Sequence, residues 1–70
     1  MDNWTADFTN DPNDDYSPIV EILCNGEEIA VIRKRKDGLE VMWYPNEEEL
    51  ILPHKWLSSL LNEAEKRMQE

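Results

Sequence analysis

The dipeptide Asn25-Gly26, which lies between two segments rich in apolar and β-branched residues, constrains the fold of this chain more than any other feature. Both residues tolerate positive φ angles, as the central positions of a type I′ turn require. Residues 19–24 and the segment that begins at Glu28 are therefore predicted to form a β-hairpin. A regular two-residue turn fixes the facing pairs: Cys24 with Glu27, Ile22 with Ile29, and Val20 with Val31.

A second turn at Asp37-Gly38 is predicted to lead into a third strand over residues 39–44. Of three competing loop lengths, we prefer a three-residue loop over residues 36–38 because it places Lys34 opposite Glu40, a pair of opposite charge. This register assigns one set of apolar residues to a helix-facing side of the sheet: Val20, Ile22, Ile29, Val31, Val41 and Trp43. It assigns another set to the outer side: Ile19, Leu23, Ala30, Ile32, Met42 and Tyr44.

The C-terminal segment has the spacing of an amphipathic helix that begins near His54. Its apolar residues recur at helical intervals: Trp56, Leu57, Leu60, Leu61, Ala64 and Met68. Pro53 suits the first turn, and Glu63 is placed to pair with Lys66 and Arg67. We interpret residues 46–49 as a turn and residues 50–52 as a short edge strand beside the third strand.

The first 17 residues contain five Asp and no Lys or Arg, so they contribute −5 to the net charge of −9. We interpret residues 1–17 as a flexible acidic tail, and residues 18–70 as one domain. Trp4, Phe8 and Tyr16 are spaced through the tail, which could let it fold onto a surface. The predicted fold class is α+β: a small antiparallel β-meander of three strands, with a short fourth, packed on one face by the C-terminal helix.

The length of 70 residues allows one domain with a thin core. A single cysteine cannot form an intrachain disulfide, the N-terminus does not resemble a secretory signal, and the apolar runs are too short to cross a membrane. We therefore expect a protein of the cytoplasm that does not bind membranes.

No segment has the spacing of a catalytic or metal-binding motif. Cys24 and His54 are the only thiol and imidazole, and we expect them on different elements without a third residue to orient them. Residues 11–15 resemble the start of a calcium loop, but Tyr16 replaces the required Gly and Ile22 replaces the bidentate Glu. We expect no enzymatic activity, no cofactor and no metal.

The first functional hypothesis rests on the net charge of −9. It is a small inhibitor or adaptor whose carboxylates engage a basic surface of a nucleic-acid-processing protein. Small inhibitors encoded by phages and plasmids have this compositional character. The candidate partner-binding residues lie in the tail, on the outer side of the sheet and in the turn after it: Trp4, Asp7, Phe8, Asp11, Asp14, Asp15, Ile32, Met42, Tyr44, Glu47 and Glu48.

The second hypothesis is an auxiliary or structural subunit that docks or forms a homodimer through the outer side of the sheet, centred on Ile32 and Met42. This side is too apolar to remain in water, although Glu21 and Glu28 lie near its borders. The tail, a second copy of the chain or a partner is expected to cover it.

The third hypothesis is nucleic-acid contact through a basic hairpin tip, which comprises Arg33, Lys34, Arg35 and Lys36. Asp37 and Glu40 offset this charge, and the remaining surface repels phosphates. We therefore expect a protein partner rather than direct binding of nucleic acid.

Overall fold

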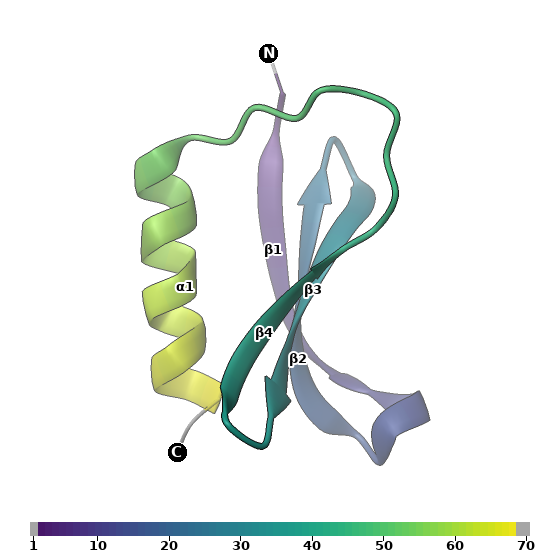
Figure 1. The fold of residues 1–70 in the computed structure, drawn as a ribbon, viewed down its shortest axis with the longest axis vertical. Coiled ribbons are helices and arrows are strands. Elements are labelled where there is room, and N and C mark those ends of the chain that lie inside the picture. Colours follow the sequence, from purple (N-terminus) through teal and green to yellow (C-terminus); the bar gives the residue numbers. More distant parts are fainter. Residues whose placement is uncertain (1, 69–70) are drawn as a thin grey trace.

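The computed structural model describes residues 2–68. The elements follow in the order β1 (Trp4–Asp11), η1 (Pro12–Asp14, one 3-10 turn), β2 (Ser17–Cys24), β3 (Glu27–Arg35), β4 (Gly38–Trp43) and α1 (His54–Met68). The four strands form one antiparallel sheet in the order β1-β2-β3-β4, and α1 lies along one side of it (Figure 1). This confirms the predicted α+β class, with an antiparallel meander and a C-terminal helix on one face.

Helix α1 begins at the predicted residue, His54. Its buried residues are Leu60, Ala64 and Met68, which recur at intervals of four and form one side of the hydrophobic core. On the exposed side, Arg67 Nε donates to Glu63 Oε1 at 2.9 Å, one helical turn away. The helical prediction and this ion pair are both confirmed.

The N-terminal segment is a strand, where we expected a flexible tail. All eight residues of β1 pair with β2. Trp4 is buried, its Nε1 donates to the carbonyl of Ile51 at 3.2 Å, and its ring centroid lies 6.0 Å from that of Trp56. The physical reason is the alternation of Trp4, Ala6 and Phe8, which gives β1 an apolar side toward α1.

The fourth strand is therefore β1, and the strand that we expected over residues 50–52 does not form. This segment instead crosses from β4 to α1 in irregular conformation (Figure 1). Leu50 and Leu52 are half-buried and pack against the core, while Ile51 is 71% exposed. Leu50 and Leu52 are apolar because this segment covers part of the hydrophobic core.

A β-bulge in β3 shifts the first hairpin. Cys24 faces Glu27 as predicted, but the register shifts between Ile22 and Leu23, so that Ile22 faces Ala30 and Val20 faces Ile32. The predicted pairs of Ile22 with Ile29 and Val20 with Val31 are therefore wrong by one residue. The extra residue lets both Ile29 and Ala30 be buried in the same core.

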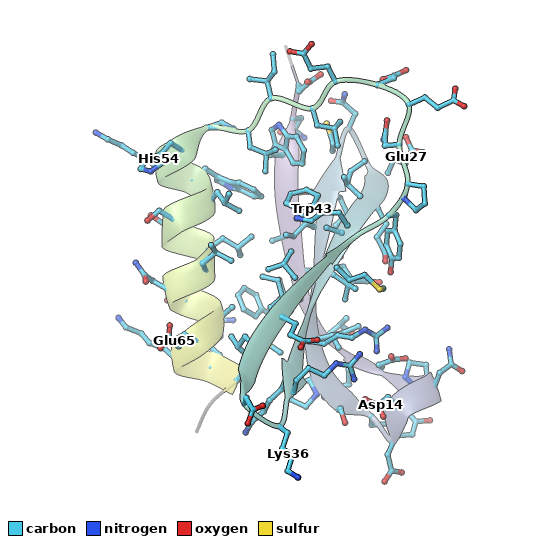
Figure 2. All side chains as sticks on the ribbon, viewed as in Figure 1. Asp14, Glu27, Lys36, Trp43, His54 and Glu65 are labelled. Atoms are coloured by element: carbon cyan, nitrogen blue, oxygen red, sulfur yellow. The ribbon has the colours of Figure 1, made fainter. Side chains whose placement is uncertain are left out.

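The shift reverses the two sides of β3 beyond the bulge. Ile32, which we predicted on the outer side, is fully buried in the core with α1. Val31 takes the outer side, and Arg33 follows it. The predicted orientation of β4 is kept, because Val41 and Trp43 face the same side as Ile32. Figure 2 shows Trp43 on the side of the sheet that faces α1.

The turn from β3 to β4 has two residues, Lys36 and Asp37, rather than three. Lys34 consequently faces Leu39, and the predicted pair of Lys34 with Glu40 does not form. Glu40 accepts from Arg35 at 3.2 Å instead. The glycine that follows the turn, Gly38, has a φ of 137°, which an L-residue rarely adopts. The loop is one residue shorter than predicted, and this offsets the one-residue shift at the bulge in β3, so that β4 keeps its predicted orientation.

Trp4→Ala tests whether the N-terminal segment belongs to the core. We expect the free energy of unfolding to fall by about 3–5 kcal/mol, because a buried indole and its hydrogen bond are lost. Thr9→Ala, at an exposed position of the same strand, should change it by less than about 1 kcal/mol. Urea denaturation followed by circular dichroism measures both. Two equally small effects would mean that the segment lies outside the core.

Candidate functional site

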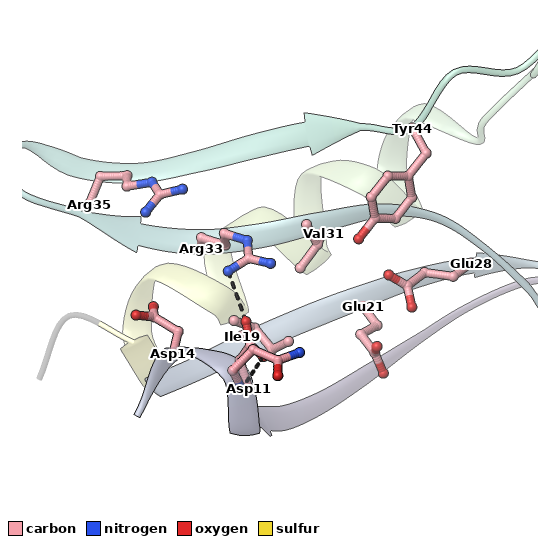
Figure 3. A pocket seen from close by; sticks show the side chains of 10 residues that line it. Asp11, Asp14, Ile19, Glu21, Glu28, Val31, Arg33, Arg35 and Tyr44 are labelled. Atoms are coloured by element: carbon pink, nitrogen blue, oxygen red, sulfur yellow. Dashed lines mark hydrogen bonds and ion pairs between the residues drawn. The ribbon is translucent and has the colours of Figure 1, made fainter. Parts of the chain in front are cut away.

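The side of the sheet turned away from α1, here called the open face, is the candidate site. It carries side chains from all four strands and from the residue after β4: Thr5, Asp7, Thr9, Asp11, Ile19, Glu21, Leu23, Glu28, Val31, Arg33, Arg35, Glu40, Met42 and Tyr44. The loop around Asp14 rises beside it, and together they enclose an open hollow of about 480 Å³ (Figure 3).

Three carboxylates from neighbouring strands form a row on the open face, here called the acidic stripe: Asp7, Glu21 and Glu28. Asp7 directly faces Glu21 across β1 and β2. The carboxyl groups of Glu21 and Glu28 point toward the same part of the hollow (Figure 3). Like charges that face each other across strands destabilise a sheet, so this arrangement costs stability.

The pKa of the Glu21 carboxyl group is raised above its usual value by these neighbours. The largest cause is a hydrogen bond between the carboxyl groups of Glu21 and Glu28. Burial is the second cause, and the charges of Glu28, Asp7 and Asp11 follow. Glu28 similarly raises the pKa of the Tyr44 hydroxyl, mainly through a hydrogen bond. The acidic stripe thus ends at the Tyr44 hydroxyl, which is hydrogen-bonded to Glu28.

The two arginines of the open face are already paired. Arg33 Nη1 lies 2.9 Å from Asp11 Oδ2, and this pair is largely withdrawn from solvent. The other oxygen of Asp11 accepts from the backbone N–H of Asn13 at 3.0 Å, which holds the first turn of η1. Arg35 pairs with Glu40. Among residues 2–68 no ion pair includes a member of the acidic stripe.

The apolar residues of the open face are mostly covered by their neighbours. Ile19 is 8% exposed and Val31 is 1% exposed, although no second layer lies over them. Arg33 and Tyr44 border the same hollow, and their long side chains lie beside Ile19 and Val31 (Figure 3). The expectation that this side needs an apolar cover is weakened accordingly, and only Met42 stays substantially exposed there.

The predicted partner-binding residues divide into accessible and structural ones. Ile32 and Trp4 are buried and contribute to the core, and Asp11 is held by Arg33. Phe8 lies on the α1 side, with the Arg67 guanidinium 4.3 Å above its ring. The remaining predicted residues are accessible or border the hollow: Asp7, Asp14, Asp15, Met42, Tyr44, Glu47 and Glu48.

The structure does not unite the four basic residues of the hairpin on one surface. Arg33 and Arg35 lie on the open face, and Lys34 lies on the α1 side. Lys36 occupies the turn (Figure 2). Because both arginines are bound to carboxylates, the residues that remain free for phosphates are Lys34 and Lys36, on different sides.

Glu21 and Glu28 are the residues of this site that sequence reasoning did not select. The sequence pattern places both near the border of the outer side, but no motif marks either as a binding residue. Their positions on either side of the Asn25-Gly26 turn are the signal that could have found them.

Other features of reactive sites are sparse. Cys24 lies at the end of β2 and His54 at the start of α1, as the sequence analysis expected. Burial, followed by the charges of Asp2, Glu27 and Glu48, raises the pKa of the Cys24 thiol. Within residues 2–68 no three His, Cys, Asp or Glu side chains are grouped to hold a metal ion, and α1 is too short and polar to cross a membrane.

Comparisons of the chain with protein-family models, curated proteins and solved structures found no match.

Glu21→Gln tests whether the acidic stripe costs stability. Because the pKa of Glu21 is higher in the folded chain than in the unfolded one, the folded state binds more protons between the two values, and stability falls as the pH rises through this window. At about pH 7 the variant should be more stable than the wild type by about 0.2–1 kcal/mol.

The gain should vanish below the unfolded pKa of about 4.3, where Glu21 is protonated in both states. Urea denaturation over a range of pH measures it, and Glu65→Gln on the exposed side of α1 is the control, which should change the stability at neutral pH by less than about 0.5 kcal/mol. A wild type that is as stable as Glu21→Gln at neutral pH would contradict the prediction.

Proposed function

We propose that this chain is a non-enzymatic protein-binding module, which captures a Lys- or Arg-containing segment of a partner protein on the open face. The observation that supports this most is the acidic stripe. Asp7 faces Glu21, the Glu21 carboxyl group hydrogen-bonds to Glu28, and no ion pair among residues 2–68 includes any of the three. The arginines next to them are paired with other carboxylates.

A cation from a partner would relieve the repulsion within the stripe. Neighbouring strands are about 4.8 Å apart, so one ammonium or guanidinium group can reach carboxylates from two strands at once. A guanidinium group can in addition form two parallel hydrogen bonds with a carboxylate. Binding therefore gains both the new contacts and the energy that the unbound stripe loses to repulsion.

The surroundings of the stripe suit the rest of a basic side chain. The Tyr44 ring and the alkyl part of Arg33 border the hollow above the buried Ile19 and Val31, and an alkyl stem can lie against them. Tyr44 closes one end of the hollow and Asp14 stands near the other (Figure 3). The hollow is open along its length, which leaves room for an extended segment rather than a single small molecule.

The overall charge supports the class of partner. A net charge of −9 on 70 residues accelerates encounters with positively charged surfaces and disfavours nucleic acid. The best match is an inhibitor or adaptor that acts in the cytoplasm on the basic surface of a nucleic-acid-processing protein, as a phage- or plasmid-type inhibitor would. On this account the acidic stripe competes with phosphates for that surface.

A peptide of alternating Arg and Ala residues tests the proposal, because in extended form it presents every guanidinium group on one side. Isothermal titration calorimetry should show binding that weakens as salt is added. The double variant Glu21→Gln and Glu28→Gln should lower the affinity by about tenfold, or roughly 1.4 kcal/mol.

The matched control removes the same number of charges elsewhere, through Glu47→Gln and Glu48→Gln in the exposed loop. It should lower the affinity by much less than the open-face double variant does. Equal losses for both double variants would show that net charge, rather than the acidic stripe, accounts for binding, and the absence of binding to the peptide would refute the proposal.

A further inference from the structure

Strand β4 is an edge of the sheet with three consecutive exposed apolar residues. Val41 is 37% exposed, Met42 45% and Trp43 44%. In Figure 1, β4 is the strand nearest the viewer, and none of the other described elements passes over its free edge. The opposite edge, β1, presents Thr5, Asp7 and Thr9 as exposed polar residues. Polar and charged residues on an edge strand, as on β1, usually prevent it from pairing with another chain. The exposed apolar residues of β4 instead favour an interface at this edge.

The backbone of β4 has a defined set of unpaired groups. The N–H of Tyr44 donates to the carbonyl of Ile29 at 2.9 Å, which marks this as a hydrogen-bonded position of the ladder. Such positions alternate in an antiparallel pair. The N–H and C=O groups of Leu39, Val41 and Trp43 therefore point away from β3 toward the free edge.

We propose that a second copy of this chain covers this edge, with the two β4 strands paired in antiparallel orientation around Val41. In this register Val41 faces its equivalent, and Leu39 faces Trp43 of the second copy. Every outward backbone group of these three residues gains a partner, because the register makes them the hydrogen-bonded positions of the new pair. Their side chains meet on the α1 side, so apolar residues face apolar residues.

The charges at the two ends of β4 favour this orientation over a parallel one. Lys34 and Lys36 lie near the start of β4, and the loop after its end contains Glu47, Glu48 and Glu49. An antiparallel pair brings the basic end of each copy next to the acidic loop of the other. A parallel pair would place like charges together at both ends, and the net charge of −9 on each chain leaves little tolerance for added repulsion.

The symmetry has a consequence for the open face. A twofold axis through the Val41 pair, perpendicular to the sheet, joins two four-stranded sheets edge to edge. Both helices then lie on one side and both acidic stripes on the other. If the stripes bind basic segments as proposed above, the dimer is a bivalent binder; the pairing of the strands does not depend on that function.

Replacement of Val41 by proline tests the backbone pairing. The N–H of Val41 points away from β3 and has no partner among residues 2–68, so Val41→Pro removes a hydrogen bond of the dimer and none of the described monomer. Sedimentation equilibrium should show a mass of two chains for the wild type and of one chain for Val41→Pro. Val41→Lys, which keeps the N–H but adds an edge charge, should also be monomeric.

The matched control is Ala6→Pro, which removes an outward N–H from the other edge strand. The backbone N–H of Asn25 donates to the carbonyl of Asn3, so Ala6 is likewise at a position whose N–H points outward. This variant should remain dimeric, and circular dichroism verifies that each variant is folded. A wild type that is monomeric at all concentrations, or a dimer that survives both Val41→Pro and Val41→Lys, would overturn the proposal.

A charge exchange tests the orientation. One variant carries Lys34→Glu and Lys36→Glu, and the other carries Glu47→Lys and Glu48→Lys. Each variant alone should dimerise more weakly than the wild type, because both ends of the interface then repel. An equimolar mixture should recover a heterodimer at least as stable as the wild-type dimer, whereas a mixture no more associated than its components would rule out the antiparallel pairing. These measurements use no peptide, so they are independent of the proposed function.

Discussion

The β-bulge in β3 determines what each side of the sheet carries. By burying both Ile29 and Ala30, it reverses the alternation of every later residue in the strand. Ile32 consequently enters the core with α1, and Arg33 reaches the open face, where Asp11 binds it at 2.9 Å. Without the bulge, Arg33 would point toward α1, and the loop that begins at Asp11 would lose its buried ionic contact.

The same shift separates the charges of the open face into a paired and an unpaired group. The arginines of β3 are held by carboxylates, while no ion pair within residues 2–68 includes Glu21, Glu28 or Asp7. A chain of 70 residues has a thin core, so a repulsive row of carboxylates is a substantial cost for it. Functional sites commonly keep such costs, because relief of the strain on binding favours the complex.

The sequence predicts those parts of the fold whose signals are local. The helical spacing of Leu60, Ala64 and Met68 and the Asn25-Gly26 turn lead to correct elements. Strand β1 was missed because its acidic composition hid the alternation that begins at Trp4. The bulge has no local signal, since residues 29–32 are all apolar and permit either register. Glu21 and Glu28 have a local signal in their positions around the Asn25-Gly26 turn, but the complete acidic stripe could not be predicted because Asp7 joins it only through the pairing of β1 with β2.

The most direct test of the account is the pKa of Glu21 with and without a basic ligand, measured by carbon NMR of its side-chain carboxyl group. In the free protein we expect a pKa above the usual glutamate value, because the hydrogen bond to Glu28, burial and the charges of Glu28 and Asp7 disfavour the charged form. Saturation with a peptide of alternating Arg and Ala should lower this pKa below the free value, because a cation then lies within the acidic stripe. A pKa that is already unperturbed in the free protein, or one that the bound peptide leaves unchanged, would contradict the account.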